Sequence, residues 1–333
     1  MQKILEVVGK GLSDGLRLIE MQPESPREGE VRISVEANAL NRADILYIDG
    51  NHYTDLTLPS RIGSEACGYV DAVGAGVKDI QEGDRVSTVP FFSTMPERHG
   101  VHGEFAIVPA EFCAPWPKAL TEIEGCSIWM QYLTAYFSVK TLADTAKGDT
   151  ILVIAGASSA GIGAIQIAKT LGANVIATTR TQSKVDFLRG VGADHVIVTD
   201  ANSNFDEEIQ AMTAGEGVKF AFDPVCGDFL KRYVGAMAWD AKIAVYGMLG
   251  GVNDIVVPIL DVLRSRTSVH AYSMYNYVKD PLLRREGIEA ISGLLDGGGL
   301  RPVVDRVFEL SEFKDAYTYM VNGAQCGKIV MKT

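Results

Sequence analysis

The sequence contains few cysteines, and their spacing excludes two classes of stabilised small domain. The five cysteines in 333 residues lie far apart and form no Cys-x-x-Cys pair: Cys67, Cys113, Cys126, Cys226 and Cys326. This pattern fits neither a disulfide framework nor a lobe built on clustered zinc ligands. We expect most of these cysteines to be plain buried thiols.

The chain also lacks a block of basic residues and a secretion signal. Its formal net charge is -11 and its pI is about 5.0. A surface of this charge does not neutralise a phosphate backbone, so nucleic acid is excluded as a main partner. The first twenty residues show no basic segment, apolar stretch and small-residue cleavage site in succession. We therefore expect a cytoplasmic protein.

One uncharged stretch, Thr150 to Ala168, is nearly long enough to cross a bilayer. Its centre, however, contains Gly156, Gly161 and Gly163 together with two serines. A membrane-spanning helix would gain from bulky apolar residues at these positions and loses stability from glycine. The stretch therefore predicts a buried strand, a tight turn and a buried helix, and no membrane partner.

The patterning changes along the chain. Up to about Leu120 short alternating runs such as "VRISVEAN" predict a compact β unit, and "EGCSIWMQYLTAYFSV" then has helical spacing. Beyond it, strands alternate with helical stretches, which predicts a parallel doubly wound α/β sheet. The expected strands are Ile151–Ala155, Asn174–Thr178, His195–Val198, Lys219–Asp223, Lys242–Tyr246 and Val269–Ser273. From about Tyr275 the pattern returns to mixed helix and strand.

The turn after the first of these strands has the composition of a dinucleotide-binding loop. In a doubly wound sheet, backbone N–H groups and a helix N-terminus hold the pyrophosphate at this point. Gly156, Ala157, Ala160, Gly161 and Gly163 leave room for a phosphate and for close packing of the helix on the strand. As a bare Gly-x-Gly-x-x-Gly match the motif is imperfect, and a tight turn without a ligand is the alternative.

The end of the second strand predicts the cofactor NADPH. An NAD site usually has an acidic residue here to bind the ribose 2′-hydroxyl, whereas this chain has Thr179, Arg180, Ser183 and Lys184 before the first acid, Asp186. Hydroxyl and cationic groups would instead bind a 2′-phosphate. Each charge-assisted bond contributes about 1.5–3 kcal/mol, so two would favour NADPH by about a hundredfold. The alternative is that both cations merely solvate a loop.

The chain resembles the zinc-free quinone oxidoreductase branch of the medium-chain dehydrogenase/reductase superfamily along nearly its whole length. The resemblance rests on a series of motifs in order: "ALNRAD", "IGSEACGYVDAVGAGV", "GDRV", "QYLTAY", the dinucleotide turn, "GADHVI", "FDPVCG" and "GKIV". It implies a GroES-like β domain, a Rossmann domain and a cofactor cleft between them. The implied domains are 1–125 and the return 271–333 for the catalytic part, and 126–270 for the NADP-binding part. It also implies a homodimer that pairs through the last Rossmann strand, near Val269–Ser273.

Both catalytic zinc ligands of the metal-dependent relatives are missing. Those relatives have Cys-x-x-Asp where this chain has Asn41-Arg42-Ala43-Asp44, and Gly-His-Glu where it has Gly63-Ser64-Glu65. A catalytic zinc needs about three nitrogen or sulfur donors, and the superfamily's four-cysteine lobe is missing too. We therefore expect no metal.

Hydride then has to reach a carbon that needs little Lewis-acid help, in a quinone, an enone or an alkenal. Positioning the reactants supplies about 7–11 kcal/mol, and a general acid adds about 10²–10⁴-fold. An NADPH-dependent reductase of such small molecules is the leading hypothesis. Reduction of carrier-bound enoyl thioesters and a nucleotide-binding protein without activity are the alternatives.

The resemblance also names candidate site residues. Tyr53 is the candidate proton donor and Tyr47 the fallback, although either could be a half-buried packing residue. His52 and His102 are weaker acid candidates. Asn41 is expected to face the cofactor ribose or the substrate. The other expected cofactor contacts are Thr134, Ser158, Ala160, Gly161, Ile162, Thr179, Arg180, Lys184, Val225, Gly247, Leu249 and Lys328.

Overall fold

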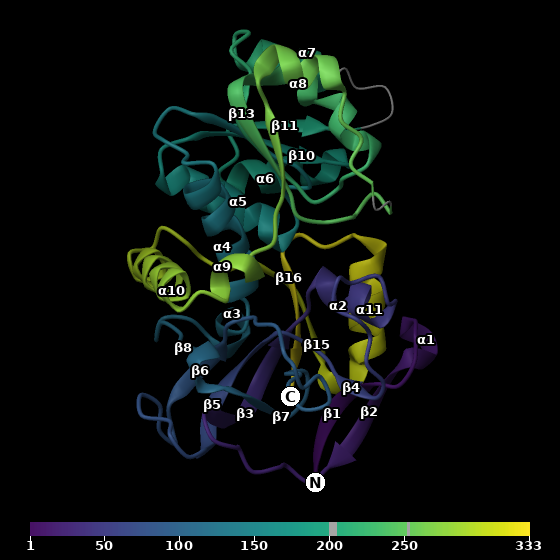
Figure 1. Cartoon of the computed structure of the whole chain (residues 1–333), viewed down its shortest axis with the longest axis vertical. Helices are drawn as coiled ribbons and strands as arrows, with labels where there is room; N and C mark the ends of the chain where they lie inside the picture. The colour runs from purple at the N-terminus through teal and green to yellow at the C-terminus, as the bar shows by residue number, and fades with distance from the viewer. Residues whose placement is uncertain (200–204, 252–253) are drawn as a thin grey trace. The chain divides into compact units, whose positions relative to one another are not determined.

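The computed structural model describes residues 1–199, 205–251 and 254–333 (Figure 1). The chain divides into two compact units, each made of segments that are not contiguous in sequence. Unit 1 comprises Met1–Met130, Val278–Asp296 and Pro302–Thr333, and unit 2 comprises Gln131–Tyr277 and Gly297–Arg301. The chain thus leaves unit 1, builds unit 2 and returns to unit 1.

Unit 1 is mainly β structure. A three-stranded sheet has the order β2-β1-β4, and a seven-stranded sheet has the path β15-β16-β3-β5-β6-β8 with β7 paired to β3. The strands are β1 (Gln2–Val7), β2 (Leu16–Met21), β3 (Glu30–Ala39), β4 (Ser60–Arg61), β5 (Glu65–Val73), β6 (Arg85–Thr88), β7 (Phe105–Pro109), β8 (Cys113–Pro115), β15 (Val304–Glu309) and β16 (Lys328–Lys332). The last strand, β16, lies between β15 and β3, so the C-terminal segment completes the sheet.

The alternation in β3 places one face of the strand in the core. Val31, Ile33 and Val35 are at most 4% exposed and pack in one cluster with Val70 and Val108. The helices of unit 1 are α1 (Leu12–Gly15), α2 (Arg42–Ile48), α3 (Glu122–Gly125), α10 (Pro281–Asp296) and α11 (Phe313–Asn322), with short 3-10 turns at Ala110–Phe112 and Leu310–Glu312. The helix α2 begins directly after β3, so Asn41 is fixed at its N-terminus.

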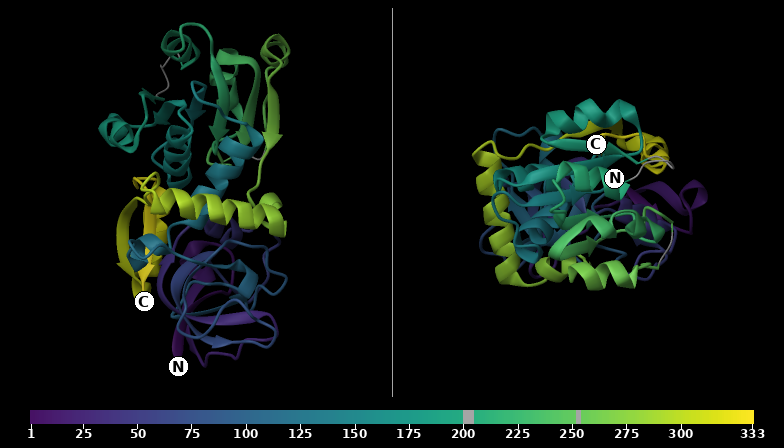
Figure 2. Two further views of the ribbon diagram at one scale, coloured as in Figure 1. Left: turned by 90° about the vertical axis from the view of Figure 1, so that its left-hand side faces the viewer. Right: turned by 90° about the horizontal axis from the view of Figure 1, so that it is seen from above.

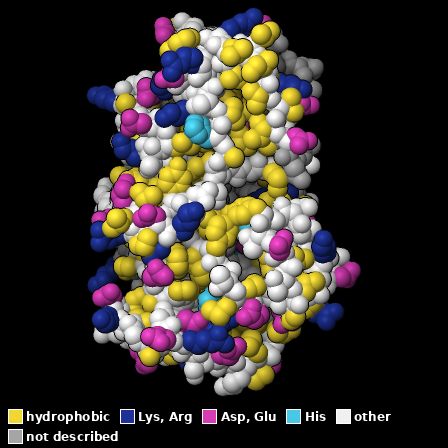
Figure 3. All heavy atoms as spheres, viewed as in Figure 1, with side chains coloured by type: hydrophobic (Ala, Val, Ile, Leu, Met, Phe, Trp, Pro, Cys, Tyr) yellow, Lys and Arg dark blue, Asp and Glu magenta, His cyan; other side chains and the backbone are white. Residues whose placement is uncertain are grey.

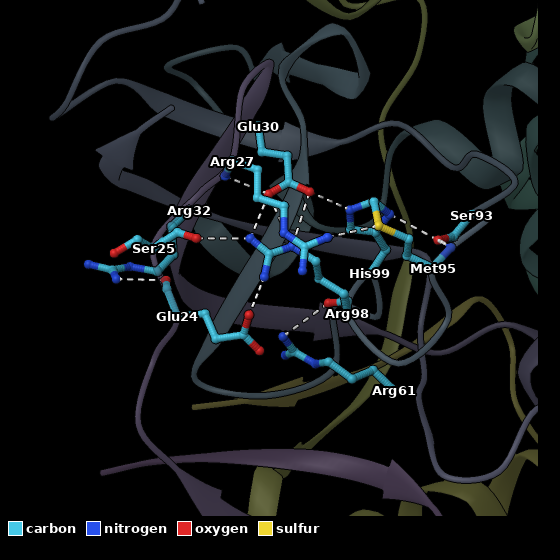
Figure 4. Close-up of polar contacts among 10 residues, drawn as sticks. All are labelled: Glu24, Ser25, Arg27, Glu30, Arg32, Arg61, Ser93, Met95, Arg98 and His99. Atoms are coloured by element: carbon cyan, nitrogen blue, oxygen red, sulfur yellow. Dashed lines mark hydrogen bonds and ion pairs between the residues drawn. The ribbon is translucent and has the colours of Figure 1, made fainter. Parts of the chain in front are cut away.

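A buried ion cluster attaches the loop before β7 to the start of β3 (Figure 4). The Arg98 guanidinium donates to both oxygens of Glu30 and also contacts Glu24, while His99 Nε2 lies 2.9 Å from Glu30 Oε1. Burial by itself raises the pKa of Glu30, but hydrogen bonds from Arg98, the Arg27 N–H and His99 outweigh it and lower that pKa to about 2. Glu30 therefore remains ionised and holds the loop in place across the ordinary pH range.

Unit 2 is a six-stranded parallel sheet with the order β11-β10-β9-β12-β13-β14. This is the strand order of a dinucleotide-binding Rossmann sheet, in which the first strand is central. The strands are β9 (Thr150–Val153), β10 (Asn174–Thr179), β11 (His195–Val198), β12 (Val218–Asp223), β13 (Met237–Val245) and β14 (Ser268–Ala271). All six expected strands are confirmed; the first ends before Ile154 because the chain turns there, and the fifth begins earlier than expected.

Helices cover both faces of this sheet (Figures 1 and 2). They are α5 (Ser159–Thr170), α6 (Val185–Val191), α7 (Phe205–Met212) and α8 (Ile259–Ser265), with 3-10 turns at Gln182–Lys184, Asp228–Arg232 and Val234–Ala236. Two further helices, α4 (Trp129–Ala135) and α9 (Tyr275–Val278), lie where the chain passes between the units, and a π-helical segment, Tyr136–Leu142, continues α4.

The uncharged stretch that raised the question of a membrane span forms β9, a turn and α5. None of the helices in the described parts of the chain has the length and hydropathy needed to cross a membrane.

Candidate functional site

The turn between β9 and α5 directs the N-terminus of α5 toward the carboxyl end of the sheet. Ala155 adopts a positive φ of 53°, and its N–H donates to Thr178 Oγ1 at 3.1 Å. The next N–H, of Gly156, donates to the Thr178 carbonyl at 2.8 Å. Ser158 then caps α5, because its Oγ accepts the Gly161 N–H at 3.1 Å. The turn is thus fixed by β10 on one side and by its own serine cap on the other.

Close packing at this turn requires glycine. A Cβ on Gly161 would lie 2.7 Å from the Ala155 carbonyl oxygen, and one on Gly163 would lie 3.0 Å from the Gln131 carbonyl oxygen. Ile162 is fully buried, whereas Ser158 and Ala160 remain half-buried. The first-turn N–H groups of a helix have no partner inside the helix, and the helix dipole adds partial positive charge there. The geometry fits a phosphate-binding turn.

The end of β10 presents cationic groups at the same edge of the sheet. Thr179 is buried, and its Oγ1 accepts the Thr181 N–H at 3.4 Å. Arg180 is exposed, and Lys184 is half-buried at the end of the following 3-10 turn. The first acid, Asp186, points into solvent with a side chain 97% exposed and lies 3.6 Å from Arg189. These residues carry the charge expected for a 2′-phosphate site.

The loops after β12 and β13 are joined to each other by backbone contacts. The N–H groups of Leu249 and Gly250 donate to the carbonyls of Pro224 and Val225 at 2.8 and 2.9 Å, and a Cβ on Gly247 would lie 2.8 Å from the Pro224 carbonyl oxygen. Leu249 itself is 43% exposed. The expected cofactor residues in these two loops therefore share one surface of unit 2.

The buried carboxylate of Asp223 fixes the loop after β12 by hydrogen bonds. Its Oδ1 accepts the N–H groups of Val225 and Cys226 at 2.6 and 3.2 Å, and its Oδ2 accepts the Tyr233 hydroxyl at 2.7 Å. Burial raises the pKa of this carboxyl, although the three hydrogen bonds oppose that effect. Asp223 therefore has a structural role beneath the surface.

Thr134 lies in α4 and belongs to unit 2. The residue is buried, and its backbone carbonyl accepts the Tyr272 hydroxyl at 2.9 Å. The expected cofactor contacts thus fall into two groups, since Asn41 and Lys328 belong to unit 1 and all the others to unit 2.

Within unit 1, Asn41 and Lys328 are in contact with each other and with the buried carboxylate of Glu65. Lys328 Nζ donates to Asn41 Oδ1 at 2.7 Å and is ion-paired with Glu65, and Asn41 Nδ2 donates to Glu65 Oε2 at 3.0 Å. Glu65 Oε1 accepts the Met130 N–H at 2.7 Å. The three side chains are at most 6% exposed. The amide of Asn41 is therefore held on both its oxygen and its nitrogen.

Two further titratable groups lie in this buried region. Burial raises the pKa of Asp44 to about 7, although the Asn41 N–H and the charge of Lys328 act in the opposite direction. Burial lowers the pKa of His102 to about 4. The His102 ring lies between the Tyr317 hydroxyl and the Ala39 carbonyl oxygen, at 2.9 and 3.2 Å. A fully buried, neutral imidazole with both nitrogens engaged does not act as an exposed acid, so we assign His102 a structural role.

The residues around Asn41 and Glu65 do not provide the ligands of a catalytic zinc ion. Asn41 and Ser64 stand where metal-dependent relatives have cysteine and histidine, and the ammonium of Lys328 already neutralises Glu65. Among the described residues there is no group of three or more histidine, cysteine or acidic side chains placed to hold a metal. The ammonium supplies a fixed positive charge within this cluster instead.

The tyrosine candidates differ in their surroundings. Tyr53 is 63% exposed, its ring stacks on His52 at 4.2 Å, and it meets Phe92 edge-on at 5.3 Å. Tyr47 is half-buried, and its hydroxyl lies 3.1 Å from Ser60 Oγ and accepts the Thr57 N–H at 3.3 Å. Tyr47 therefore braces the loop that follows α2, whereas Tyr53 presents its side chain to solvent.

His52 is half-buried, and its ring stacks on that of Tyr53. Its Nδ1 accepts the Thr54 N–H at 3.1 Å, and burial lowers its pKa. A neutral imidazole that accepts at Nδ1 carries its proton on Nε2.

Sequence reasoning did not find the ion pair of Glu65 with Lys328. The two residues are separated by 263 positions and come from β5 and the start of β16. The only sequence signal was a lysine in an apolar terminal strand, "GKIVMKT", where burial of the charge requires a partner.

Comparisons with known proteins agree with this architecture. The chain matches the family model of the alcohol dehydrogenase GroES-like domain over residues 27–118 and that of zinc-binding dehydrogenases over residues 160–321. Among curated proteins, it is 30% identical over 325 residues to a probable quinone oxidoreductase of Leishmania amazonensis, covering 93% of this chain and 91% of that protein. It is 27% identical over 327 residues to the 2-haloacrylate reductase of a Burkholderia species, covering 97% and 96%.

A solved structure extends the comparison to three dimensions. The structure of mycobacterial Rv1454c complexed with NADPH superposes with a TM-score of 0.90 at 25% identity and covers 100% of both chains. The fold and these matches define an oxidoreductase of the medium-chain dehydrogenase/reductase superfamily, with a GroES-like domain and a Rossmann domain. Within that superfamily, the chain belongs to the zinc-independent, quinone oxidoreductase-like branch.

The Glu65–Lys328 pair generates a stability prediction. We expect Lys328→Met to lower the free energy of unfolding by about 3–5 kcal/mol, because it leaves the Glu65 carboxylate buried without its cation. The double variant Lys328→Met/Glu65→Gln should recover a large part of that loss, because it removes the orphaned charge. Urea unfolding at pH 7 measures both. A single variant as stable as the wild type would show that the carboxylate reaches solvent.

Proposed function

We propose that the protein is an NADPH-dependent, metal-independent reductase of quinones or α,β-unsaturated carbonyl compounds in the cytoplasm. The observation that carries this proposal is the end of β10, where Thr179 is the last residue of the strand, Arg180 follows it and the first acid is turned into solvent. The glycine-dependent turn at the N-terminus of α5 supports it. The names of the relatives add support, since two of them denote reduction of quinones or of an acrylate.

In this proposal each unit has a binding task. Backbone N–H groups at the N-terminus of α5 hold the pyrophosphate, and Arg180 and Lys184 hold the 2′-phosphate. The bound cofactor supplies a hydride, which is two electrons and one proton in a single transfer. Asn41 presents an amide whose orientation is set by Lys328 and Glu65. A fixed amide orients the reacting groups without cost at the moment of reaction.

A proton has to reach the oxygen of the acceptor after hydride arrives at carbon. Tyr53 is our candidate donor, because its side chain is exposed and its hydroxyl is a donor at neutral pH. The neighbouring aromatic rings of His52 and Phe92 provide an apolar surface beside it. Flat, conjugated acceptors are the chemical class that such a surface binds best.

Unit 2 also has features of a homodimer interface. Among the described residues β14 pairs only with β13, so one edge of the sheet is open. In α8, Ile259, Leu260 and Leu263 are 62–66% exposed. Figure 3 shows apolar side chains gathered in the upper part of the view, in the region of α8. Open strand edges and exposed apolar patches of this kind mark association surfaces, and we propose that β14 and α8 pair with a second copy.

Cofactor choice is tested at Arg180. We expect Arg180→Ala to raise the Kd for NADPH by about tenfold or more, because one charge-assisted bond contributes about 1.5–3 kcal/mol, and to leave the Kd for NADH unchanged. Fluorescence titration with each cofactor measures both constants. Arg189→Ala, which removes another exposed arginine of unit 2, is the matched control. Equal losses for NADPH and NADH would contradict the assignment of Arg180 to the 2′-phosphate.

The reaction is tested with a panel of acceptors. We expect oxidation of NADPH with a quinone and an enone, and a kcat at least about tenfold lower for Tyr53→Phe at unchanged KM for NADPH. Tyr69→Phe is the control, because Tyr69 is also exposed, at 42%, in unit 1. Turnover of an enoyl thioester alone would favour the carrier-bound substrate, and binding of NADPH without any turnover would favour a non-catalytic protein. Unchanged kcat in Tyr53→Phe would exclude Tyr53 as the donor.

The homodimer is tested by sedimentation. We expect the wild-type protein to sediment at twice the chain mass of 35.9 kDa. Leu263→Glu should shift it to the monomer, because a buried unpaired charge opposes association. The corresponding control is Leu282→Glu in α10 of unit 1, where the leucine is 68% exposed. A wild-type monomer, or loss of the dimer in the control alone, would refute this interface.

A further inference from the structure

Tyr246 lies directly after β13, at the carboxyl edge of the unit 2 sheet. Its backbone N–H donates to the Asp223 carbonyl oxygen at 2.9 Å. Its ring stacks on Phe222 of β12, with ring centroids 4.0 Å apart and an angle of 21° between the planes. The stack and the backbone bond together fix the direction in which the hydroxyl points.

That hydroxyl is buried, yet within the described residues it has no hydrogen-bond partner. Burial raises its pKa well above the usual value, and the charge of Asp223 raises it further, whereas the nearby Ser158 side chain lowers it. The group therefore remains protonated and available as a donor. Buried polar groups in native proteins are nearly always satisfied, so an orphaned hydroxyl calls for an explanation.

The neighbouring polar groups are already engaged with other partners. Ser158 Oγ accepts the Gly161 N–H at the cap of α5. Asp223 accepts two backbone N–H groups and the Tyr233 hydroxyl. Tyr246 is thus a rigid donor close to Ser158 at the N-terminus of α5, a helix of 12 residues, and none of the described acceptors forms a hydrogen bond with its hydroxyl. A phosphate held at that N-terminus would bring acceptor oxygens to this place.

We propose that the Tyr246 hydroxyl donates a hydrogen bond to a pyrophosphate oxygen of the dinucleotide held at the N-terminus of α5. The inference rests on the proposed function and adds to it a binding residue from the far side of β12. The orphaned hydroxyl makes the free protein less stable than it would be with a phenyl ring. Binding of the dinucleotide supplies the missing acceptor. The Tyr246 hydroxyl therefore lowers the stability of the free protein and raises the stability of the complex.

The test is Tyr246→Phe, assayed with three probes that differ in the groups they carry. NADPH has both the pyrophosphate and the 2′-phosphate, ADP-ribose has only the pyrophosphate, and 2′-AMP has only the 2′-phosphate. We expect the Kd for NADPH and for ADP-ribose to rise about tenfold or more, from the loss of one hydrogen bond to a charged group. The Kd for 2′-AMP should not change. Arg180→Ala should give the opposite selectivity, with losses for NADPH and 2′-AMP only.

Thermal unfolding gives a readout that is independent of activity. We expect the Tm of free Tyr246→Phe to equal or exceed that of the wild type, because no hydrogen bond is lost, and NADPH to raise it by less than in the wild type. Tyr233→Phe is the matched control. Its hydroxyl already donates to Asp223 in the free protein, so its loss should lower the Tm of the free protein.

The outcomes separate this inference from the proposed function. If the wild type binds NADPH and ADP-ribose and Tyr246→Phe binds both equally well, the inference alone is overturned, and the hydroxyl is an unsatisfied packing group. A loss that includes 2′-AMP would also overturn it, because the effect would then not be confined to the pyrophosphate. If the wild type binds neither NADPH nor ADP-ribose, both the inference and the proposed function are wrong.

Discussion

The close approach of α5 to β9 is the constraint on which unit 2 depends. The helix can reach the sheet only because Gly161 has no Cβ, which would lie 2.7 Å from the Ala155 carbonyl oxygen. This approach aims the helix N-terminus at the carboxyl edge of the sheet, where β10, β12 and β13 also end. The serine cap, the cations after β10 and the hydrogen-bonded loops after β12 and β13 therefore lie at the same edge of the sheet. A displaced helix would no longer present its N-terminus beside these groups.

In unit 1 the central feature is a buried ion pair between Lys328 and Glu65, at the place where metal-dependent relatives bind zinc. Lys328 lies at the start of β16, and its buried ammonium is ion-paired with Glu65 and donates to Asn41 Oδ1. Removing both charges from water is costly, and their attraction offsets that cost only when the remaining hydrogen bonds are satisfied. The Met130 N–H on Glu65 contributes one of these bonds. The result is a side-chain amide in a fixed orientation, with a fixed positive charge next to it.

Tyr246 shows the opposite arrangement, a polar group that the free protein leaves unsatisfied. Its neighbour Tyr233 is also a tyrosine with a buried hydroxyl, but that hydroxyl has an acceptor in Asp223. The charge of Asp223 raises the pKa of both tyrosines, but its carboxylate accepts the hydroxyl of Tyr233, whereas the hydroxyl of Tyr246 has no partner among the described residues. Residues that break a local rule of polar satisfaction concentrate where proteins bind ligands, because the ligand completes the set. The contrast within one unit is the reason to assign Tyr246 to binding rather than to packing.

The sequence by itself determined the parallel sheet, the glycine-rich turn between β9 and α5 and the absence of an acid directly after β10. These features depend on local periodicity, on small residues at a turn and on the residue type at a strand end, all of which can be read over short windows. Only the tertiary structure decided that Lys328 meets Glu65, that His102 is a buried structural group and that the Tyr246 hydroxyl has no acceptor. Each of these facts depends on side chains that are distant in the sequence. Pairing across that distance, and the desolvation that sets the protonation state, depend on how the strands pack, and the residues next to each partner in the sequence do not identify the other partner.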